Sequence, residues 1–271
     1  MQRSHRAVFT LPFLGALSVA LLFLSSCEEP PKPTPTKPSA TPAAPPSAVA
    51  SSKPEPEKKV ARKPRKQAED CPKGPVVKFD DPKVEEAVRF KLQKPKGDIT
   101  KAELGKIRSL NLSQMQVDEL DICLLPHMKD LRELFLGRGE LDDLSPIAGL
   151  TKLQSLRASM NRVRDLSPLS GMADMDRLDL GLTQASDLKP LSGMTKLTEL
   201  QLDDTPVEDV APLAKLTKLE RLSLQRTRVK DFSPLLPLKS LKFLYVKGSP
   251  GEFDAMSQLG KLTQGGLRIM M

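Results

Sequence analysis

A repeat of 22 residues runs through most of this chain and restricts the folds open to it. Leucines recur at this interval, and an earlier copy, Leu110, precedes the first of them by 24 residues. The leucines in register are Leu134, Leu156, Leu178, Leu200, Leu222 and Leu244. A single repeat cannot enclose its own apolar side chains, whereas stacked repeats bury them in a continuous strip. The spacing therefore predicts a solenoid, with repeats over residues 107–247.

The second half of each repeat carries the motif Asp-x-x-Pro. Its copies begin at Asp143, Asp165, Asp187, Asp209 and Asp231. An aspartate at a helix N-cap accepts a backbone N–H, and a proline in the first turn loses no needed donor. The motif therefore predicts a short helical turn in each repeat. A ladder of cation sites is the alternative, but each aspartate lacks the cluster of convergent oxygens that such a site needs.

The full pattern is Leu-x-x-Leu-x-x-Leu-x-Leu-x-x-Thr-x-Val-x-Asp-x-x-Pro-Leu, as between Leu213 and Leu235. It closely resembles the 22-residue leucine-rich repeats of bacterial internalin-type proteins, over roughly Leu110 to Val246. The resemblance implies an α/β fold: a curved solenoid with short parallel strands on its concave side and 3₁₀ or extended turns on its convex side.

One position departs from the family pattern. The family usually has asparagine there, and this chain has it only at Asn161, with Gly139, Thr183, Thr205 and Thr227 in other copies. Whether threonine hydroxyls replace part of the asparagine ladder is left open by the sequence.

Segments at both ends of the repeats are suited to cover the open solenoid. Residues 80–92 follow an Asp-Pro pair with apolar residues on one helical face, and Thr100 to Glu103 form a capping box. They predict a helical N-terminal cap over residues 74–106, similar to the caps of internalin-like proteins. After the repeats, Glu252 to Leu262 predicts a helix and Leu267 to Ile269 a last strand, within a C-terminal cap over residues 248–271.

Residues 1–26 have the organisation of a signal peptide, with Arg3 and Arg6 before an apolar stretch. The stretch ends in Leu24-Ser25-Ser26-Cys27, which resembles the lipobox of bacterial lipoproteins. That resemblance implies acylation of Cys27, a membrane tether without a spanning helix, and a location in the cell envelope. Glu28 follows the cysteine, which favours the outer membrane over the inner one. A plain secretory signal or an uncleaved anchor, with Cys27 incidental, is the alternative.

Residues 27–73 are predicted to form a disordered, proline-rich stalk. The composition cannot bury enough apolar surface to offset the entropy of ordering, and the prolines favour extended polyproline II. Basic residues from Lys58 to Lys66 end the tract. This basic run is suited to contact anionic lipid or a cell-wall polymer, or it is a solubilising linker.

Cys71 and Cys123 remain as a pair if Cys27 is acylated. In an exported protein a disulfide between them is expected, and two buried free thiols are the alternative. The bond would close a loop of about 50 residues and could contribute on the order of 4 kcal/mol.

Residues that catalysis or cofactor binding would need are scarce. Once residues 1–26 are removed, His127 is the only histidine, and a hydrolase triad needs a placed imidazole. The sequence has no zinc-binding constellation, phosphate-binding glycine loop or dinucleotide motif. We therefore expect no enzymatic activity, no cofactor and no metal site.

The formal charge of +8 is spread so that only +3 belongs to the residues from Cys71 onward. The folded part has no basic stripe with interleaved aromatic residues, which argues against nucleic-acid binding.

Residues that alternate with the buried leucines project from the concave face, where the core does not dictate their identity. They suggest a protein-binding surface, because aromatic and arginine residues commonly anchor partners. The predicted binding residues are Glu133, Phe135, Arg138, Arg157, Arg177, Asp179, Glu199, Gln201, Asp203, Arg221, Ser223, Arg226, Phe243 and Tyr245. For Phe243 and Tyr245, packing under the C-terminal cap is an equal alternative.

The sequence thus favours a monomeric, membrane-tethered protein that binds a protein partner in adhesion or envelope scaffolding. A structural envelope component is the second hypothesis, with the stalk on cell-wall polymer and the solenoid as a spacer.

Overall fold

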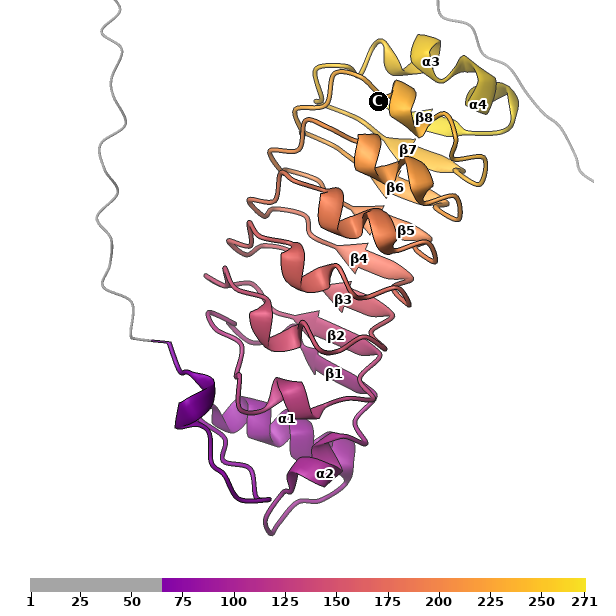
Figure 1. The fold of residues 1–271 in the computed structure, drawn as a ribbon. Helices are drawn as coiled ribbons and strands as arrows, with labels where there is room; N and C mark the ends of the chain where they lie inside the picture. The colour runs from indigo at the N-terminus through magenta and orange to yellow at the C-terminus, as the bar shows by residue number, and fades with distance from the viewer. Residues whose placement is uncertain (1–64) are drawn as a thin grey trace, which may run out of the picture. The chain divides into compact units, whose positions relative to one another are not determined.

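The computed structural model describes residues 65–271. The predicted signal peptide, Cys27 and most of the stalk lie outside the described residues. Within residues 65–271, eight short parallel strands form one sheet in chain order (Figure 1). The strands are β1 (Ser109–Leu112), β2 (Glu133–Leu136), β3 (Ser155–Arg157), β4 (Arg177–Asp179), β5 (Glu199–Gln201), β6 (Arg221–Ser223), β7 (Phe243–Tyr245) and β8 (Arg268–Met270). The predicted leucine-rich-repeat solenoid is confirmed.

The 22-residue spacing sets the register of the sheet. Leu134 pairs with Leu156, and each aligned leucine pairs with the next one along the stack. The chain crosses back on the other side of the stack, which bends toward the strands (Figure 1). The 3₁₀ turns there are η2 (Leu125–His127), η3 (Ser145–Ile147), η4 (Ser167–Leu169), η5 (Lys189–Gly193), η6 (Ala211–Lys215) and η7 (Ser233–Leu235).

The core is a strip of aliphatic side chains between the strands and the 3₁₀ turns. In one repeat, Leu200, Val207, Leu213 and Leu216 are all fully buried. Burial of one such side chain contributes about 2 kcal/mol. An uncovered end of the stack would lose several of these contributions, so both ends need caps.

The aspartate of each Asp-x-x-Pro motif accepts the N–H of the residue two positions later. Asp143 accepts from Ser145 at 2.8 Å, and Asp187 accepts from Lys189 at 2.9 Å. The N-cap of η3 is Leu144, so the aspartate lies one residue before the predicted N-cap position. The aspartate closes an Asx-turn that leads into the 3₁₀ helix. The aspartate therefore starts each turn as predicted, but from one residue before the N-cap.

Asn161 and the threonines at its repeat position hydrogen-bond differently. The Asn161 side chain contacts the preceding repeat, whereas the hydroxyls of Thr183 and Thr205 donate to carbonyls three residues earlier. At Gly139, a Cβ atom would lie 2.2 Å from the carbonyl oxygen of Val117, so only glycine fits there. Thr183 and Thr205 therefore satisfy their own turns, whereas the Thr227 hydroxyl also lies 2.9 Å from the Ser249 hydroxyl of the next repeat.

The N-terminal cap contains α1 (Pro82–Leu92) and α2 (Lys101–Leu104). Asp81 caps α1 by accepting from the N–H of Lys83, and Thr100 and Glu103 form the predicted capping box of α2. α2 is a single turn, shorter than a full second helix.

The C-terminal cap differs from the single helix expected over Glu252 to Leu262. It has two short helices, α3 (Ala255–Gln258) and α4 (Gly260–Gln264). Leu259 leaves the helical conformation, with φ −107° and ψ 19°, just before a glycine. Strand β8 begins one residue later than predicted, at Arg268.

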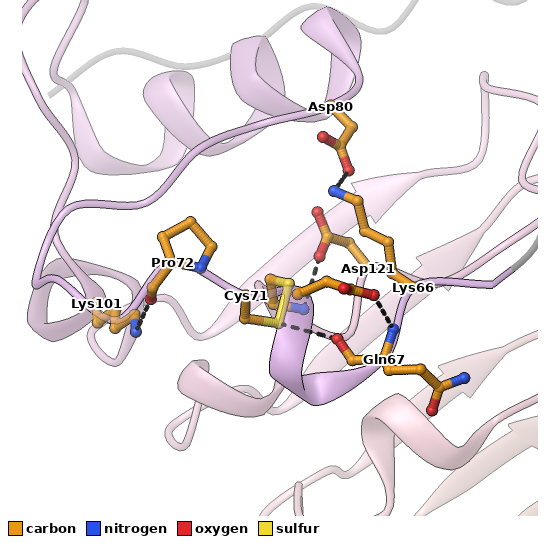
Figure 2. The surroundings of a disulfide bond; sticks show 9 residues. Lys66, Gln67, Cys71, Pro72, Asp80, Lys101 and Asp121 are labelled. Atoms are coloured by element: carbon orange, nitrogen blue, oxygen red, sulfur yellow. Dashed lines mark hydrogen bonds and ion pairs between the residues drawn. A yellow bond between two sulfur atoms is a disulfide. The ribbon is translucent and has the colours of Figure 1, made fainter.

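Cys71 and Cys123 form a disulfide with Cα atoms 5.2 Å apart (Figure 2). A short 3₁₀ turn, η1 (Ala68–Asp70), precedes Cys71, and the Lys101 ammonium donates to the carbonyl of Pro72 at 2.8 Å. The sequence places residues 65–73 in the stalk, but the disulfide and these polar contacts hold them against the cap. The folded part therefore begins before residue 74, the predicted boundary.

Within residues 65–271, no helix has the length and apolar character needed to cross a membrane.

Candidate binding surface

Two rows of outward-facing side chains cover the concave side of the sheet, which we call the strand face. On each strand they flank the central buried residue, and the strand register aligns them across the stack. The first row is Ser109, Glu133, Ser155, Arg177, Glu199, Arg221, Phe243 and Arg268. The second row is Asn111, Phe135, Arg157, Asp179, Gln201, Ser223, Tyr245 and Met270. Most of the predicted binding residues belong to these rows.

A shallow groove of about 320 Å³ crosses the strand face over β2 to β5. Its lining includes Glu133, Phe135, Arg177 and Gln201. Charged and amide groups surround one aromatic ring there, a combination that offers directional polar contacts beside an apolar one.

Ion pairs link neighbouring strands on this face. The guanidinium of Arg157 lies 3.1 Å from a carboxylate oxygen of Asp179, and that of Arg221 lies 2.7 Å from Glu199. Each pair is exposed and contributes little to stability. Within residues 65–271, the ion pair of Arg177 is looser, 3.6 Å to the adjacent Asp176. Its guanidinium is thus the most available of the three to a partner.

Phe243 lies between two arginines of its own row. The guanidinium carbon of Arg221 is 5.5 Å from the ring centroid, and that of Arg268 is 5.9 Å away. Both distances are typical of cation–π contacts. Tyr245 occupies the second row of the same strand, and both aromatic side chains are half-buried. The structure thus places Phe243 and Tyr245 on the strand face.

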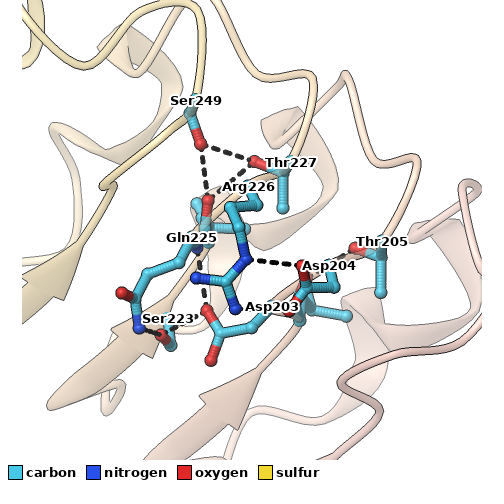
Figure 3. A network of polar contacts seen from close by, with 10 residues as sticks. Asp203, Asp204, Thr205, Ser223, Gln225, Arg226, Thr227 and Ser249 are labelled. Atoms are coloured by element: carbon cyan, nitrogen blue, oxygen red, sulfur yellow. Dashed lines mark hydrogen bonds and ion pairs between the residues drawn. The ribbon is translucent and has the colours of Figure 1, made fainter. Parts of the chain in front are cut away.

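Asp203 and Ser223 hold each other in place and are less available than the sequence suggested. Asp203 accepts from the Ser223 hydroxyl at 2.6 Å and from the Gln225 N–H at 2.8 Å (Figure 3). Ser223 is only 6% exposed. The Ser223 hydroxyl is therefore already bonded across the repeats and is less accessible to a partner than the charged side chains of the two rows.

Arg138 and Arg226 lie beyond the ends of their strands, on the rim of the strand face. Arg226 forms a bidentate ion pair with Asp204 of the preceding repeat (Figure 3). This contact lowers the pKa of Asp204 and raises that of Arg226. Arg138 is exposed.

A ridge of left-handed residues along the rim was not predicted from the sequence. Met160, Leu182, Asp204 and Arg226 have φ between 52° and 58° and recur every 22 residues. Met160 is 54% exposed and Leu182 50% exposed. Large non-glycine residues are unfavourable in this conformation. Gly248 occupies the same position one repeat after Arg226 and has φ 76°. This glycine is the one sequence signal from which the left-handed conformation could have been predicted.

His127 ends η2, away from the strand face, and is half-buried. Burial, with smaller contributions from Lys101 and Lys129, lowers the pKa of His127, so the imidazole is neutral at neutral pH. In the described part of the chain, no group of three or more His, Cys, Asp or Glu side chains is placed to hold a metal ion.

Comparison with known proteins supports the fold assignment. Residues 89–205 match the family model for the leucine-rich repeats of leucine-rich repeat and WD repeat-containing protein 1. The mouse protein of that name is 43% identical over 72 residues, and the match spans 26% of this chain and 10% of the mouse protein.

Several solved structures are similar to the described solenoid. Internalin C2 of Listeria monocytogenes is 31% identical, with a TM-score of 0.59, and the match covers 62% of this chain and 76% of that one. Internalin InlF of the same species is 26% identical, with a TM-score of 0.54, over 71% and 68% of the two chains. The leucine-rich-repeat protein LIC12759 of Leptospira interrogans is 21% identical, with a TM-score of 0.56, over 63% and 44%, and shows the same fold. This chain is 31% identical to internalin C2, and the match covers 76% of that protein. This chain therefore belongs to the internalin-like leucine-rich-repeat proteins.

Proposed function

We propose that this chain is a lipid-anchored protein of the bacterial cell envelope that binds a protein partner through its strand face. The observation that carries the proposal is the pair of outward rows. The core requires the buried leucine between them, but it does not require arginine, glutamate or phenylalanine beside it. A groove of about 320 Å³ lies within these rows, and a partner that fills it would meet Phe135 and Arg177.

The tether is proposed from the sequence of residues 1–73. Acylation of Cys27 would hold the chain on a membrane, preferentially the outer one, and the proline-rich stalk would extend the solenoid away from it. Adhesion and envelope scaffolding are both compatible with this arrangement.

Partner capture from envelope extracts tests the role of the strand face. The test variant is Phe135→Ala with Arg177→Glu. The matched control is Lys189→Glu with Lys215→Glu, because both lysines are exposed on the convex 3₁₀ turns η5 and η6. We expect a protein that the wild type and the control retain and that the strand-face variant loses. Equal retention by all three chains would contradict binding through this face.

The second candidate is an envelope spacer whose basic run, Lys58 to Lys66, contacts an anionic cell-wall polymer. The charge pattern of the stalk favours it. Charge reversal at Arg157, Arg177 and Arg221 separates the two functions. If the strand face binds a protein, this charge reversal would abolish protein capture. If the solenoid is a spacer, the reversal would change no measured property. Retention in the envelope would be unchanged in either case.

Intact-mass analysis of membrane-extracted protein, beside Cys27→Ser, tests the tether. A mature chain that begins at Cys27 and carries acyl mass is expected. An unacylated wild-type chain in the soluble fraction would contradict the lipid anchor and leave the strand-face proposal standing.

A further inference from the structure

The strand face changes in charge along the sheet. Over its last three strands, β6, β7 and β8 (Figure 1), the two outward rows contain cations and aromatic rings and no acidic residue. These side chains are Arg221, Phe243 and Arg268 in the first row, and Ser223, Tyr245 and Met270 in the second. The acidic residues of both rows lie on β2, β4 and β5. The C-terminal end of the strand face is therefore positively charged.

The ring of Phe243 holds the two arginines of its row in place. Their guanidinium carbons lie 5.5 Å and 5.9 Å from its centroid, and such cation–π contacts restrict otherwise flexible side chains. A guanidinium that is already positioned loses less entropy when it binds a carboxylate through two parallel hydrogen bonds. The ring therefore prepares these arginines to bind an anion.

Arg268 differs from Arg221 in its charge balance. Arg221 contacts Glu199 at 2.7 Å. Arg268 is exposed, and among residues 65–271 it contacts the Phe243 ring but forms no ion pair. Its positive charge is thus left for a group that the domain does not supply.

Lys247 adds a second charge of this kind. It is exposed and forms no ion pair in the described part of the chain. Lys247 occupies the repeat position of Gln225, whose side-chain amide lies 3.4 Å from the Ser223 hydroxyl of the second row (Figure 3). By the same repeat geometry, Lys247 lies beside Tyr245. The two unpaired cations therefore flank the aromatic pair.

Apolar surface lies next to these cations. Phe243 and Tyr245 are half-buried, and Met270 is 47% exposed. Arginine and aromatic side chains are the residues that most often anchor a protein partner. The acidic residues on β2, β4 and β5 interrupt the positive charge toward the other end of the face. The positive area is therefore short, and it fits a short acidic peptide segment better than a long polyanion.

We propose, resting on the proposed function, that Arg268 and Lys247 bind a carboxylate-rich segment of the protein partner. We call Arg221, Phe243, Tyr245, Lys247 and Arg268 the carboxylate site. Arg268 binds one carboxylate of the segment through two hydrogen bonds, and Lys247 binds a second one as a point charge. The groove over β2 to β5 receives another part of the same partner. Because the site is exposed, added salt weakens the binding.

Tyr245 provides a local readout for this site. The chain has one tyrosine and no tryptophan, so the tyrosine fluorescence of the full mature chain reports on Tyr245 alone, whatever the stalk binds. The probe is hexaglutamate, with hexaglutamine as the uncharged peptide of the same length. We expect hexaglutamate to change the fluorescence at low salt but not at high salt, and hexaglutamine to leave it unchanged. No response to hexaglutamate, or an equal response to both peptides, would overturn the proposal.

A charge-removing variant tests the two cations directly. For Arg268→Gln with Lys247→Gln, we expect the half-maximal fluorescence change at about ten-fold higher hexaglutamate concentration. The matched control, Lys189→Gln with Lys215→Gln, removes the same charge from the convex turns η5 and η6 and should titrate like the wild type. Equal titration of all three chains would contradict the site. Equal weakening in the control would contradict it too, because only the net charge of the domain would then matter.

Hexagalacturonate separates a peptide from an anionic polysaccharide, since it carries the same number of carboxylates on a sugar backbone. We expect it to bind more weakly than hexaglutamate. If it binds at least as tightly and depends on Arg268 and Lys247, the occupant is a polysaccharide and the peptide proposal is wrong.

Partner capture from envelope extracts distinguishes failure of this inference from failure of the proposed function. A protein whose capture requires Phe135 and Arg177 but is unaffected by Arg268→Gln with Lys247→Gln would overturn the carboxylate site and leave the strand-face function standing. If the wild type captures no protein, the proposed function fails, and the Tyr245 titration still decides whether this end of the face binds carboxylates.

Discussion

The side chain of Asn161 ties two repeats together through Gly137. Its Nδ2 donates to the Gly137 carbonyl of the preceding repeat at 3.1 Å, and its Oδ1 accepts from the Leu141 N–H at 3.3 Å. Thr183, at the same position one repeat later, donates only to Leu180 of its own repeat, at 2.7 Å. Asparagine and threonine thus perform different tasks at one repeat position.

Asn161→Ala is expected to destabilise the domain more than Thr183→Val. The alanine variant leaves the buried Leu141 N–H and the Gly137 carbonyl without a partner, which should cost about 2–3 kcal/mol. The valine variant loses one hydroxyl of similar shape, at a cost of about 1 kcal/mol. Urea unfolding of both variants beside the wild type measures the difference. Equal losses would show that the cross-repeat bonds contribute nothing beyond a local turn.

The repeat, its register and the start of its turns could be predicted from the sequence because they follow from spacing. Residues 22 apart occupy equivalent places, so one aligned leucine fixes the register of strands β2 to β7. The aspartate of each motif needs only the backbone two residues away, as Asp143 does with Ser145. Both features depend on residues of a single repeat, so the sequence of that repeat is enough to predict them.

Features that depend on neighbouring repeats could not be predicted in the same way. Ser223 alternates with buried leucines like any outward residue, but Asp203 of the preceding repeat captures its hydroxyl. The left-handed backbone at Met160 and Leu182 is imposed by stacking, against the preference of those residues. The C-terminal helix likewise divides at Leu259, which is fully buried at the end of the core.

Loss of the disulfide should lower the stability of the whole domain. The bond joins residues 52 positions apart, and the loss of chain entropy on closing such a loop corresponds to about 4 kcal/mol. For Cys71→Ser with Cys123→Ala we expect a decrease of about 2–4 kcal/mol in the free energy of unfolding, measured in urea without reductant.

The wild type in reductant is the matched comparison and should unfold at the same urea concentration as the double variant. Alkylation of both cysteines in the unreduced, folded wild type would contradict the disulfide.

Replacement of Leu182 by asparagine should stabilise the domain. Leu182 has φ 56° and is half exposed, so the change relieves an unfavourable backbone conformation and sacrifices little burial. Asparagine tolerates this conformation well, and the expected gain is about 0.5–1 kcal/mol. The control is Gln184→Asn, two residues on and exposed, which should leave the melting temperature unchanged. If Leu182→Asn lowers the melting temperature, the exposed leucine makes a packing contribution larger than the backbone strain.

The stability of the N-terminal cap should depend on the charge of Glu103 in acid. Its carboxylate contacts the Lys94 ammonium at 2.9 Å and accepts from the N–H and hydroxyl of Thr100. These contacts, that of Lys94 first, lower the pKa of Glu103 to about 2. Because the folded-state pKa is depressed, the stabilisation is complete above the unfolded-state pKa of about 4.3. It is lost as the pH falls from there toward 2.

Glu103→Gln isolates this effect, because an amide oxygen can still accept both bonds from Thr100 and so keeps the capping box. The wild type should melt at a higher temperature than the variant near pH 6, and the gap should close as the pH falls below about 4. The contact with Lys94 is partly exposed, so added salt should also narrow the gap. Thermal melts from pH 6 to pH 2.5 measure both trends, with the exposed Glu86→Gln as the control. Parallel melting curves for wild type and Glu103→Gln across that range would show that the ion pair does not contribute, and that the cap is held by Thr100 alone.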